Sequence, residues 1–291
     1  MGSLAFVDID ELILHEEVIP SLLDSVVSEL RATGMLLHPV VVSSQHLMVL
    51  DGNHRVEALK RVGAKRVLAY QVDYSSDEVV VKRWFRSVSG DLDVEAVLKR
   101  VAEELGVEVV RTGREESIAF LESDRRAIAS VLESEGSAFL LRSDSPVPTH
   151  RAYAMMAEID RVLAPYGLLH ETEDEALARL GRRERRAVVA SRPIRKEDVI
   201  ESALNGIRFP PKSSRHVVKG RVLFAMVPLE VLLSDDEDVA ESYLRRIGEL
   251  RVLTLPPGSI VDRFYEEEVR VIVHGPELRS YYPQHIRALM G

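Results

Sequence analysis

The chain has 291 residues, of which 46% are hydrophobic and 29% are charged, and its formal net charge is −9 at pH 7. This length favours two domains over one, and the composition is typical of a soluble globular protein. The absence of cysteine excludes disulfides, thiolate metal sites and a cysteine nucleophile, while the acidic balance argues against a broad nucleic-acid-binding face.

The N-terminus lacks the basic and then apolar pattern of a signal peptide, so we expect a cytoplasmic protein. No apolar run of about 18 residues occurs, and we therefore expect no membrane span. The first predicted elements are a strand (4–9), a helix from Pro20 to Thr33 that ends at Gly34, and a strand (39–42). Acidic residues Glu16 and Glu17 stand at the entry to this helix, where the helix dipole alone is enough to favour them.

Residues 47–62 predict a strand, a tight turn and a helix. Leu47–Leu50 is an apolar run suited to a short buried strand, and Asp51–Gly52 breaks it. Asn53 is a good N-cap for a helix that runs to about Val62.

This turn places His54 and Arg55 in the first turn of the helix, where positive charge is disfavoured. The pattern is explained if an anion such as phosphate binds there, next to a glycine that allows close approach of the backbone. The alternative is an ordinary strand–turn–helix whose His and Arg face water.

The stretch Gly52–Ala58 matches the G-x-x-R-x-x-A box of the ParB/sulfiredoxin-like superfamily. The elements predicted before it also fit, so that the resemblance covers about residues 1–75. It implies an α/β domain whose box binds nucleotide phosphates. It also implies that the segment containing Glu16 lies across the nucleotide site from the box, where a carboxylate can accept a proton from an attacking hydroxyl.

After a predicted strand (66–72), Ser75–Asp77 is expected to cap a helix that carries Val79–Val81, Trp84 and Phe85. A single tryptophan at helical spacing is usually part of a core, but this one lies where the wall of an interdomain cleft is expected. Ser89–Asp91 has the composition of a boundary. We therefore predict a nucleotide-binding domain over residues 1–88 and a second α/β domain over residues 89–291, with a cleft between them.

The middle of the chain predicts an α/β domain without a nucleotide fingerprint of its own. It contains no P-loop, no kinase catalytic loop and no His-Glu-x-x-His helix. The basic run 182–186 is expected to be a solvated face. Helices are predicted over 94–105, 151–163 and 196–205, and strands over 137–141 and 188–190.

A polar loop is predicted after the prolines Pro210–Pro211, which exclude both a helix and a central strand. It displays three potential cations and two hydroxyl groups within five residues, and binding sites often lie on such loops. The alternative is a loop that only faces solvent. Its members are Lys212, Ser213, Ser214, Arg215 and His216.

These segments together resemble, in order and spacing over residues 4–230, the free L-serine kinases, which are ParB-like enzymes. The resemblance implies that Glu16 is the general base and that Asp51 orients the hydroxyl or the metal-bound phosphate. It implies that Gly52, Asn53, His54 and Arg55 bind the phosphates of the donor, and that Trp84, Ser214 and His216 bind the amino acid. Position 214 carries Ser where we expect Thr, which keeps the hydroxyl. We add Lys212 and Arg215 as cations for the serine carboxylate or for phosphate.

The resemblance further implies ADP or ATP as the donor, Mg²⁺ to neutralise charge during transfer, and O-phospho-L-serine as a product that feeds cysteine synthesis. Neither a nucleic acid nor a membrane is an expected partner, and the oligomeric state is left open. A helix (235–246) and a strand (268–274) are predicted in the last part of the chain, without a function.

Two other functions remain open at this stage. A CTP-binding DNA-partitioning protein uses the same box but needs a helix-turn-helix and a basic surface, which the sequence does not show. A regulator that only senses a nucleotide or an amino acid needs no catalytic carboxylate. Sulfiredoxin chemistry is excluded because it requires a cysteine.

Overall fold

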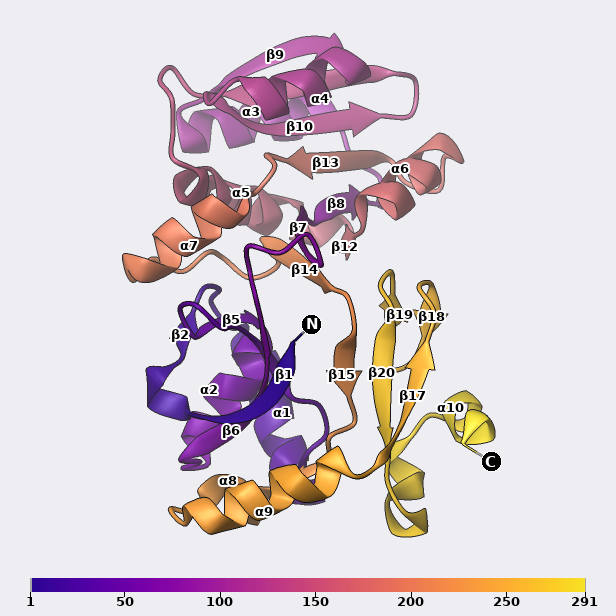
Figure 1. Ribbon diagram of the computed structural model, residues 1–291. Coiled ribbons are helices and arrows are strands. Elements are labelled where there is room, and N and C mark those ends of the chain that lie inside the picture. The colour runs from indigo at the N-terminus through magenta and orange to yellow at the C-terminus, as the bar shows by residue number, and fades with distance from the viewer. Residues whose placement is uncertain (1, 291) are drawn as a thin grey trace. The chain divides into compact units, whose positions relative to one another are not determined.

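The computed structural model describes residues 2–290, which divide into two compact units (Figure 1). Unit 1 comprises the chain up to Val80 and again from His216, and unit 2 comprises Val81–Arg215. The chain passes into unit 2 within β7 (Val79–Arg83) and returns within β14 (Ser214–Val218). Within the described residues, no helix has the length and apolar character needed to cross a membrane.

The first part of unit 1 is a mixed five-stranded sheet. The outer strand β1 runs antiparallel to β6, β4 runs parallel to β6, and β5 runs antiparallel to β4 and parallel to β2. Helix α1 (Pro20–Thr33) ends at Gly34, whose φ is +65°, and packs against α2 (Asn53–Arg61). The strand order is β1 (Ser3–Asp8), β6 (Arg66–Val72), β4 (Val40–Ser43), β5 (Met48–Asp51) and β2 (Ile13–Leu14), with a short 3-10 helix η1 (Ile9–Glu11) after β1.

The second part of unit 1 comes from the C-terminal third of the chain. Its sheet has the order β15 (Arg221–Leu223), β20 (Val269–Val273) and β17 (Arg251–Leu255). Helices α8 and α9 lie against β6 and β1 (Figure 1). The remaining elements are β3 (Met35–Leu36), which pairs with β16 (Val227–Pro228), α8 (Leu229–Leu233), α9 (Glu237–Gly248), the hairpin β18 (Ser259–Ile260) and β19 (Phe264–Tyr265), η3 (Pro276–Tyr281) and α10 (Gln284–Leu289).

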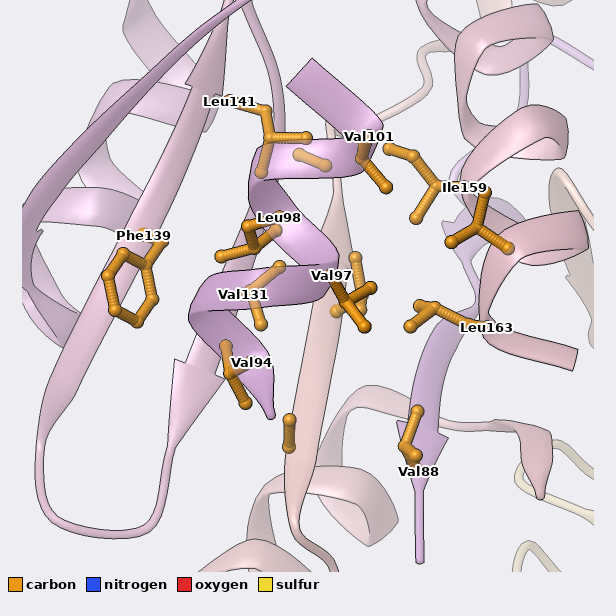
Figure 2. Packing of buried hydrophobic residues seen from close by; sticks show 14 of the residues in the cluster. Val88, Val94, Val97, Leu98, Val101, Val131, Phe139, Leu141, Ile159 and Leu163 are labelled. Atoms are coloured by element: carbon orange, nitrogen blue, oxygen red, sulfur yellow. The ribbon is translucent and has the colours of Figure 1, made fainter. Parts of the chain in front are cut away.

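Unit 2 is a six-stranded antiparallel sheet covered by helices on both faces. Side chains alternate between two cores, so that Val131 belongs to the core beneath α3 and α5 while Leu132 faces α4 and α6. Figure 2 shows the first core, in which side chains of α3 point toward Ile159 and Leu163 of α5. The strand order is β12 (Leu168–Glu171), β8 (Phe85–Val88), β13 (Ala187–Ser191), β10 (Ala127–Glu133), β11 (Ser137–Arg142) and β9 (Glu108–Gly113). The helices are α3 (Val94–Leu105), α4 (Arg114–Ser123), α5 (Thr149–Leu163), η2 (Ala164–Tyr166), α6 (Glu173–Gly181) and α7 (Lys196–Leu204).

The predicted α/β fold class is confirmed, and most predicted elements lie within a few residues of the observed ones. The helix predicted around Trp84 is wrong. Val79–Arg83 and Phe85–Val88 are strands, and Trp84 lies between them. The run of β-branched valines from Val79 restricts side-chain rotamers in a helix and packs well in a strand.

The division into units differs from the predicted boundary after residue 88. Unit 2 is an insertion between two chain segments that fold together as unit 1. The C-terminal segment joins the N-terminal one because Val227 and Pro228 pair with Leu36 and Met35. Met35 also packs against the core of the C-terminal sheet. No local sequence signal predicts that the chain after His216 folds together with the N-terminal segment.

Candidate functional site

The turn between β5 and α2 requires a glycine at position 52. Gly52 has a φ of +108°, and a Cβ at this position would lie 2.8 Å from Cγ1 of Val40 and 3.0 Å from Nη2 of Arg55. Gly52 is therefore the N-cap of α2, and Asn53, predicted as the cap, is the first helical residue. The turn lies at the start of a helix, where the first N–H groups have no partner within the helix, and such helix starts commonly bind anions.

Asn53 adds an unsatisfied polar atom at this helix start. Its side chain is 7% exposed, and its Oδ1 has no hydrogen-bond partner among the described residues. A buried acceptor without a partner costs free energy. A ligand that brings a donor to this turn would remove that cost.

His54 connects the first turn of α2 to the entry of α1. Its Nε2 accepts a hydrogen bond of 2.9 Å from the backbone N–H of Ile19, the N-cap of α1. Accepting at Nε2 places the ring proton on Nδ1. The His54 imidazole therefore joins the start of α2 to the start of α1, the helix that follows Glu16.

Arg55 is held by the protein itself. Its Nη1 donates to the carbonyl oxygens of His38 at 3.0 Å and Pro39 at 2.6 Å, and its Nη2 lies 3.3 Å from Oδ1 of Asp51. The guanidinium therefore fixes the segment before β4 against the turn. Its side chain remains 21% exposed.

Asp51 is contacted by three guanidinium groups. Besides Arg55, its Oδ2 accepts hydrogen bonds from Nη1 of Arg221 and, at 2.9 Å, from Nη2 of Arg263. Arg221 also donates to Glu267 at 3.2 Å. Burial alone would raise the pKa of Asp51, but the three arginines outweigh burial and hold the pKa well below its ordinary value. Asp51 is therefore ionised at every pH at which the protein is expected to work.

Glu16 is brought to the same edge of the sheet as this turn. Ile13 and Leu14 of β2 pair in parallel with Met48 and Val49 of β5, so the residues after both strands emerge together. The Glu16 side chain is 14% exposed, and its Oε1 lies 3.9 Å from Nε2 of the buried His15. Glu16, the predicted base, and the turn of residues 51–55, which is predicted to bind phosphate, are thus neighbours within unit 1.

His216 lies in a buried cluster of unit 1. Its Nε2 is 2.8 Å from the hydroxyl oxygen of Tyr74, and its ring meets that of His15 edge to face, with 5.2 Å between ring centroids. Burial holds the pKa of His216 well below its ordinary value, and His15 lowers it further. The imidazole is therefore neutral near pH 7. It was predicted on an exposed loop, but it belongs to β14 and is 6% exposed.

The other predicted substrate residues gather around Trp84 in unit 2. The indole Nε1 donates to the carbonyl oxygen of Ser214 at 3.1 Å. Lys212 Nζ lies 5.3 Å and Arg215 Cζ 5.6 Å from the ring centroid of Trp84, within the range of cation–π interactions. The prediction of an open loop is also wrong for Ser214 and Arg215, which are the first residues of β14. Alternate residues of this strand, beginning with Ser214, are buried.

No family model matches the chain. The chain is 25% identical over 236 residues to an ATP-dependent L-serine kinase of Staphylothermus marinus, which covers 78% of this chain and 90% of that protein. It is 27% identical over 220 residues to an ADP-dependent L-serine kinase of Thermococcus kodakarensis, which covers 73% of this chain and 86% of that protein.

A solved structure of a free serine kinase in complex with AMP superposes on the chain with a TM-score of 0.66. The superposition covers 79% of this chain and 93% of the kinase, at 23% sequence identity. The chain has the fold of the free serine kinases.

Within this serine-kinase fold, the predicted site residues form two groups. Unit 1 brings together Glu16, the turn residues 51–55 and His216, and unit 2 brings together Trp84, Lys212, Ser214 and Arg215. The sequence did not indicate Arg221, Arg263 or Tyr74. No local signal marked Arg221, which follows Lys219-Gly220, or Arg263, which follows Asp262. Their partner Asp51 is far away in the sequence.

Among residues 2–290, no group of three His, Asp or Glu side chains is placed to hold a metal ion. Mg²⁺ commonly uses only one or two carboxylates and completes its shell with phosphate oxygens and water. In unit 1, Glu16 and Asp51 carry oxygen donors of this kind, and those of Asp51 are engaged by three arginines.

Proposed function

We propose that this protein transfers the terminal phosphoryl group of ADP or ATP to the hydroxyl group of free L-serine, giving O-phospho-L-serine. The observation that carries the proposal is the parallel pairing of β2 with β5, which puts Glu16 beside the anion-binding turn of residues 51–55. The similarity to L-serine kinases over more than 70% of the chain supports it.

The donor phosphates would bind at the start of α2. Gly52, Asn53, His54 and Arg55 would hold the phosphate oxygens, through the backbone N–H groups at the helix start and through the imidazole and guanidinium side chains. Asp51 would orient the hydroxyl or the metal-bound phosphate. Mg²⁺ would neutralise the charge that moves from the transferred group to the leaving group.

Glu16 would act as the general base. As the serine oxygen forms its bond to the terminal phosphorus, its proton passes to the carboxylate of Glu16, and the bond from phosphorus to the bridging oxygen breaks. The leaving group is AMP when ADP is the donor and ADP when ATP is the donor. A base of this kind typically contributes about 10²–10⁴-fold to the rate.

The amino acid would be recognised by residues of the second group together with His216 of the first. Trp84, Ser214 and His216 would bind serine, with the Ser214 hydroxyl in the place where we expect Thr. Lys212 and Arg215 would neutralise its carboxylate or the phosphate. The product would feed cysteine synthesis.

The decisive experiment is a matrix of donors and acceptors. Purified protein with Mg²⁺ is incubated with serine, threonine or homoserine, each with ADP, ATP or CTP, and products are identified by ³¹P NMR and mass spectrometry. We expect phosphoserine from ADP, ATP or both. Nucleotide binding without phosphoserine would indicate a sensor, and CTP hydrolysis stimulated by DNA would indicate a partitioning protein.

A further inference from the structure

The C-terminal segment of unit 1 places Arg263 beside the turn of residues 51–55, which we call the phosphate turn. Arg263 lies in the tight turn of the hairpin β18–β19, which is closed by a 2.9 Å hydrogen bond from the N–H of Val261 to the carbonyl oxygen of Arg263. A second 2.9 Å bond joins the N–H of Gly258 to the carbonyl oxygen of Tyr265. Val261 and Tyr265 are 2% and 3% exposed and belong to the core of the C-terminal sheet. The backbone of Arg263 is thus fixed by a buried anchor.

The side chain of Arg263 is directed by two further contacts. Its Nη2 donates to Asp51 Oδ2 at 2.9 Å, and its Cζ lies 5.1 Å from the ring centroid of Tyr265. The hydroxyl of Tyr265 donates to Asp262 at 2.8 Å, which holds the ring in place. A guanidinium that stacks on a fixed ring loses little freedom when it pairs with a carboxylate.

Arg221 and Arg263 bind the same oxygen of Asp51 but differ in their exposure to solvent. Arg221 is 4% exposed and is also bound to Glu267 and to the carbonyl oxygen of His216, so it belongs to the interior. Arg263 is 54% exposed. An ion pair this accessible adds little to stability. Global stability therefore gives no reason for the hairpin to bring a cation here.

We propose that Arg263 is a positioning residue of the phosphate turn: it holds Asp51, and through Asp51 the Gly52 turn, in the geometry that binds the donor phosphates. Asp51 immediately precedes Gly52, so any rotation of the Asp51 peptide moves the N–H groups that follow. The C-terminal hairpin is then part of the nucleotide site. This inference rests on the proposed function for its ligand class, a nucleoside di- or triphosphate.

The test uses the full chain with Arg263→Ala, Arg263→Lys and the control Arg251→Ala. Arg251 is an exposed arginine of the same C-terminal segment that bonds to the carbonyl oxygen of Met290 and does not contact Asp51. ADP and ATP affinities are measured by calorimetry, donor and serine kinetics by phosphoserine formation, and melting temperature by scanning fluorimetry. Each assay is repeated with tens of millimolar ethylguanidinium.

We expect Arg263→Ala to weaken nucleotide binding and kcat/KM for the donor by about tenfold or more, because small misplacements of binding groups have large effects. The KM for serine and the melting temperature should stay close to those of Arg251→Ala. Ethylguanidinium should restore part of the loss in Arg263→Ala alone, and Arg263→Lys should retain part of the affinity. A purely structural role would not give chemical rescue.

Two results would overturn the inference. One is nucleotide affinity in Arg263→Ala equal to that of Arg251→Ala, and the other is a loss that follows the melting temperature and is not rescued. Wild-type protein that binds no nucleotide would overturn both the inference and the proposed function. Nucleotide binding that depends on Arg263 without any phosphoserine would reject the proposed function and support the inference.

Discussion

Two arginine–aspartate clusters, one in each unit, are built from the same residue types but are organised differently. In unit 2, Arg86 is 1% exposed and forms a two-pronged pair with Asp160, with Nε–Oδ1 and Nη2–Oδ2 distances of 2.9 and 3.0 Å. In unit 1, Asp51 is shared by Arg55, Arg221 and Arg263, the last of which is half-exposed.

The difference teaches how to separate structural from functional charges. The Arg86–Asp160 pair matches one fork to one carboxylate, and the third nitrogen of Arg86 donates to the backbone at 2.9 Å. Such a buried pair is sensitive to loss of either partner. Without Arg86, the remaining polar partner of Asp160 that we identify is His170, whose Nε2 lies 3.4 Å from Asp160 Oδ2. The Asp51 cluster instead gathers several cations on one carboxylate next to the start of a helix, an arrangement suited to a further anion.

The largest expected effect tests whether the chemistry belongs to unit 1. Glu16→Gln removes the proposed base but keeps the shape of the side chain. We expect phosphoserine formation to fall by about 10²–10⁴-fold, with the dissociation constant for nucleotide changed by less than about threefold. The measurements are steady-state kinetics and calorimetric titration with ADP or ATP.

The matched control is Glu17→Gln, which changes the adjacent exposed carboxylate. It should retain the activity of the unaltered protein. Equal losses in both variants would mean that general negative charge near α1, not a base at position 16, supports the reaction.

The next effect concerns the buried pair of unit 2. Arg86→Met should lower the free energy of unfolding by about 3–5 kcal/mol, because it leaves Asp160, with a side chain 18% exposed, without its guanidinium. Urea unfolding followed by circular dichroism measures this change. Arg161→Met is the control: Arg161 is 61% exposed and pairs with Glu158 and Glu104, so about 0–1 kcal/mol is expected. Similar losses in both variants would mean that the burial of Arg86 does not set the contribution of its ion pair to stability.

The sequence predicted those features that depend on a few neighbouring residues. The ends of α1 and α3 were predicted because Gly34 and Gly106 take left-handed φ values of 65° and 64°, which is the common use of glycine after a helix. The β5–α2 turn was predicted from the Asp51–Gly52 break and from Asn53 as a helix cap, and the observed cap is Gly52, one residue earlier.

The sequence did not predict contacts between distant segments. Arg221 and Arg263 lie 170 and 212 positions after Asp51, and no periodicity or turn signal connects residues so far apart. The strands that flank Trp84 were missed because polar Ser75–Asp77 resembles a helix cap, whereas pairing of β8 with β12 and β13 decides the structure. The roles assigned to Trp84, Ser214 and His216 stay predictions.

The smallest expected effect is a change with pH in the free energy of unfolding, caused by a histidine of unit 1. Burial lowers the pKa of His38 from 6.5 to about 4, although Asp262 opposes the change. In the unfolded chain, His38 therefore takes up a proton as the pH falls below about 6.5. In the folded chain it does so only near pH 4. Stability must fall as the pH is lowered through this window, by about 2 kcal/mol for His38 alone between pH 7 and pH 5.

The neutral ring of His38 has a defined role, because its Nδ1 accepts a 3.0 Å hydrogen bond from the N–H of Phe224. Asn at position 38 keeps an acceptor in a similar place but does not titrate. His38→Asn should therefore show a smaller drop in unfolding free energy between pH 7 and pH 5, whatever its stability at pH 7. The exposed His285 provides the control variant His285→Asn, which should keep the original pH dependence. If His38→Asn also keeps it, the acid sensitivity of unit 1 comes from its other histidines, the buried His15 and His216 and the half-buried His274, whose pKa values burial also lowers.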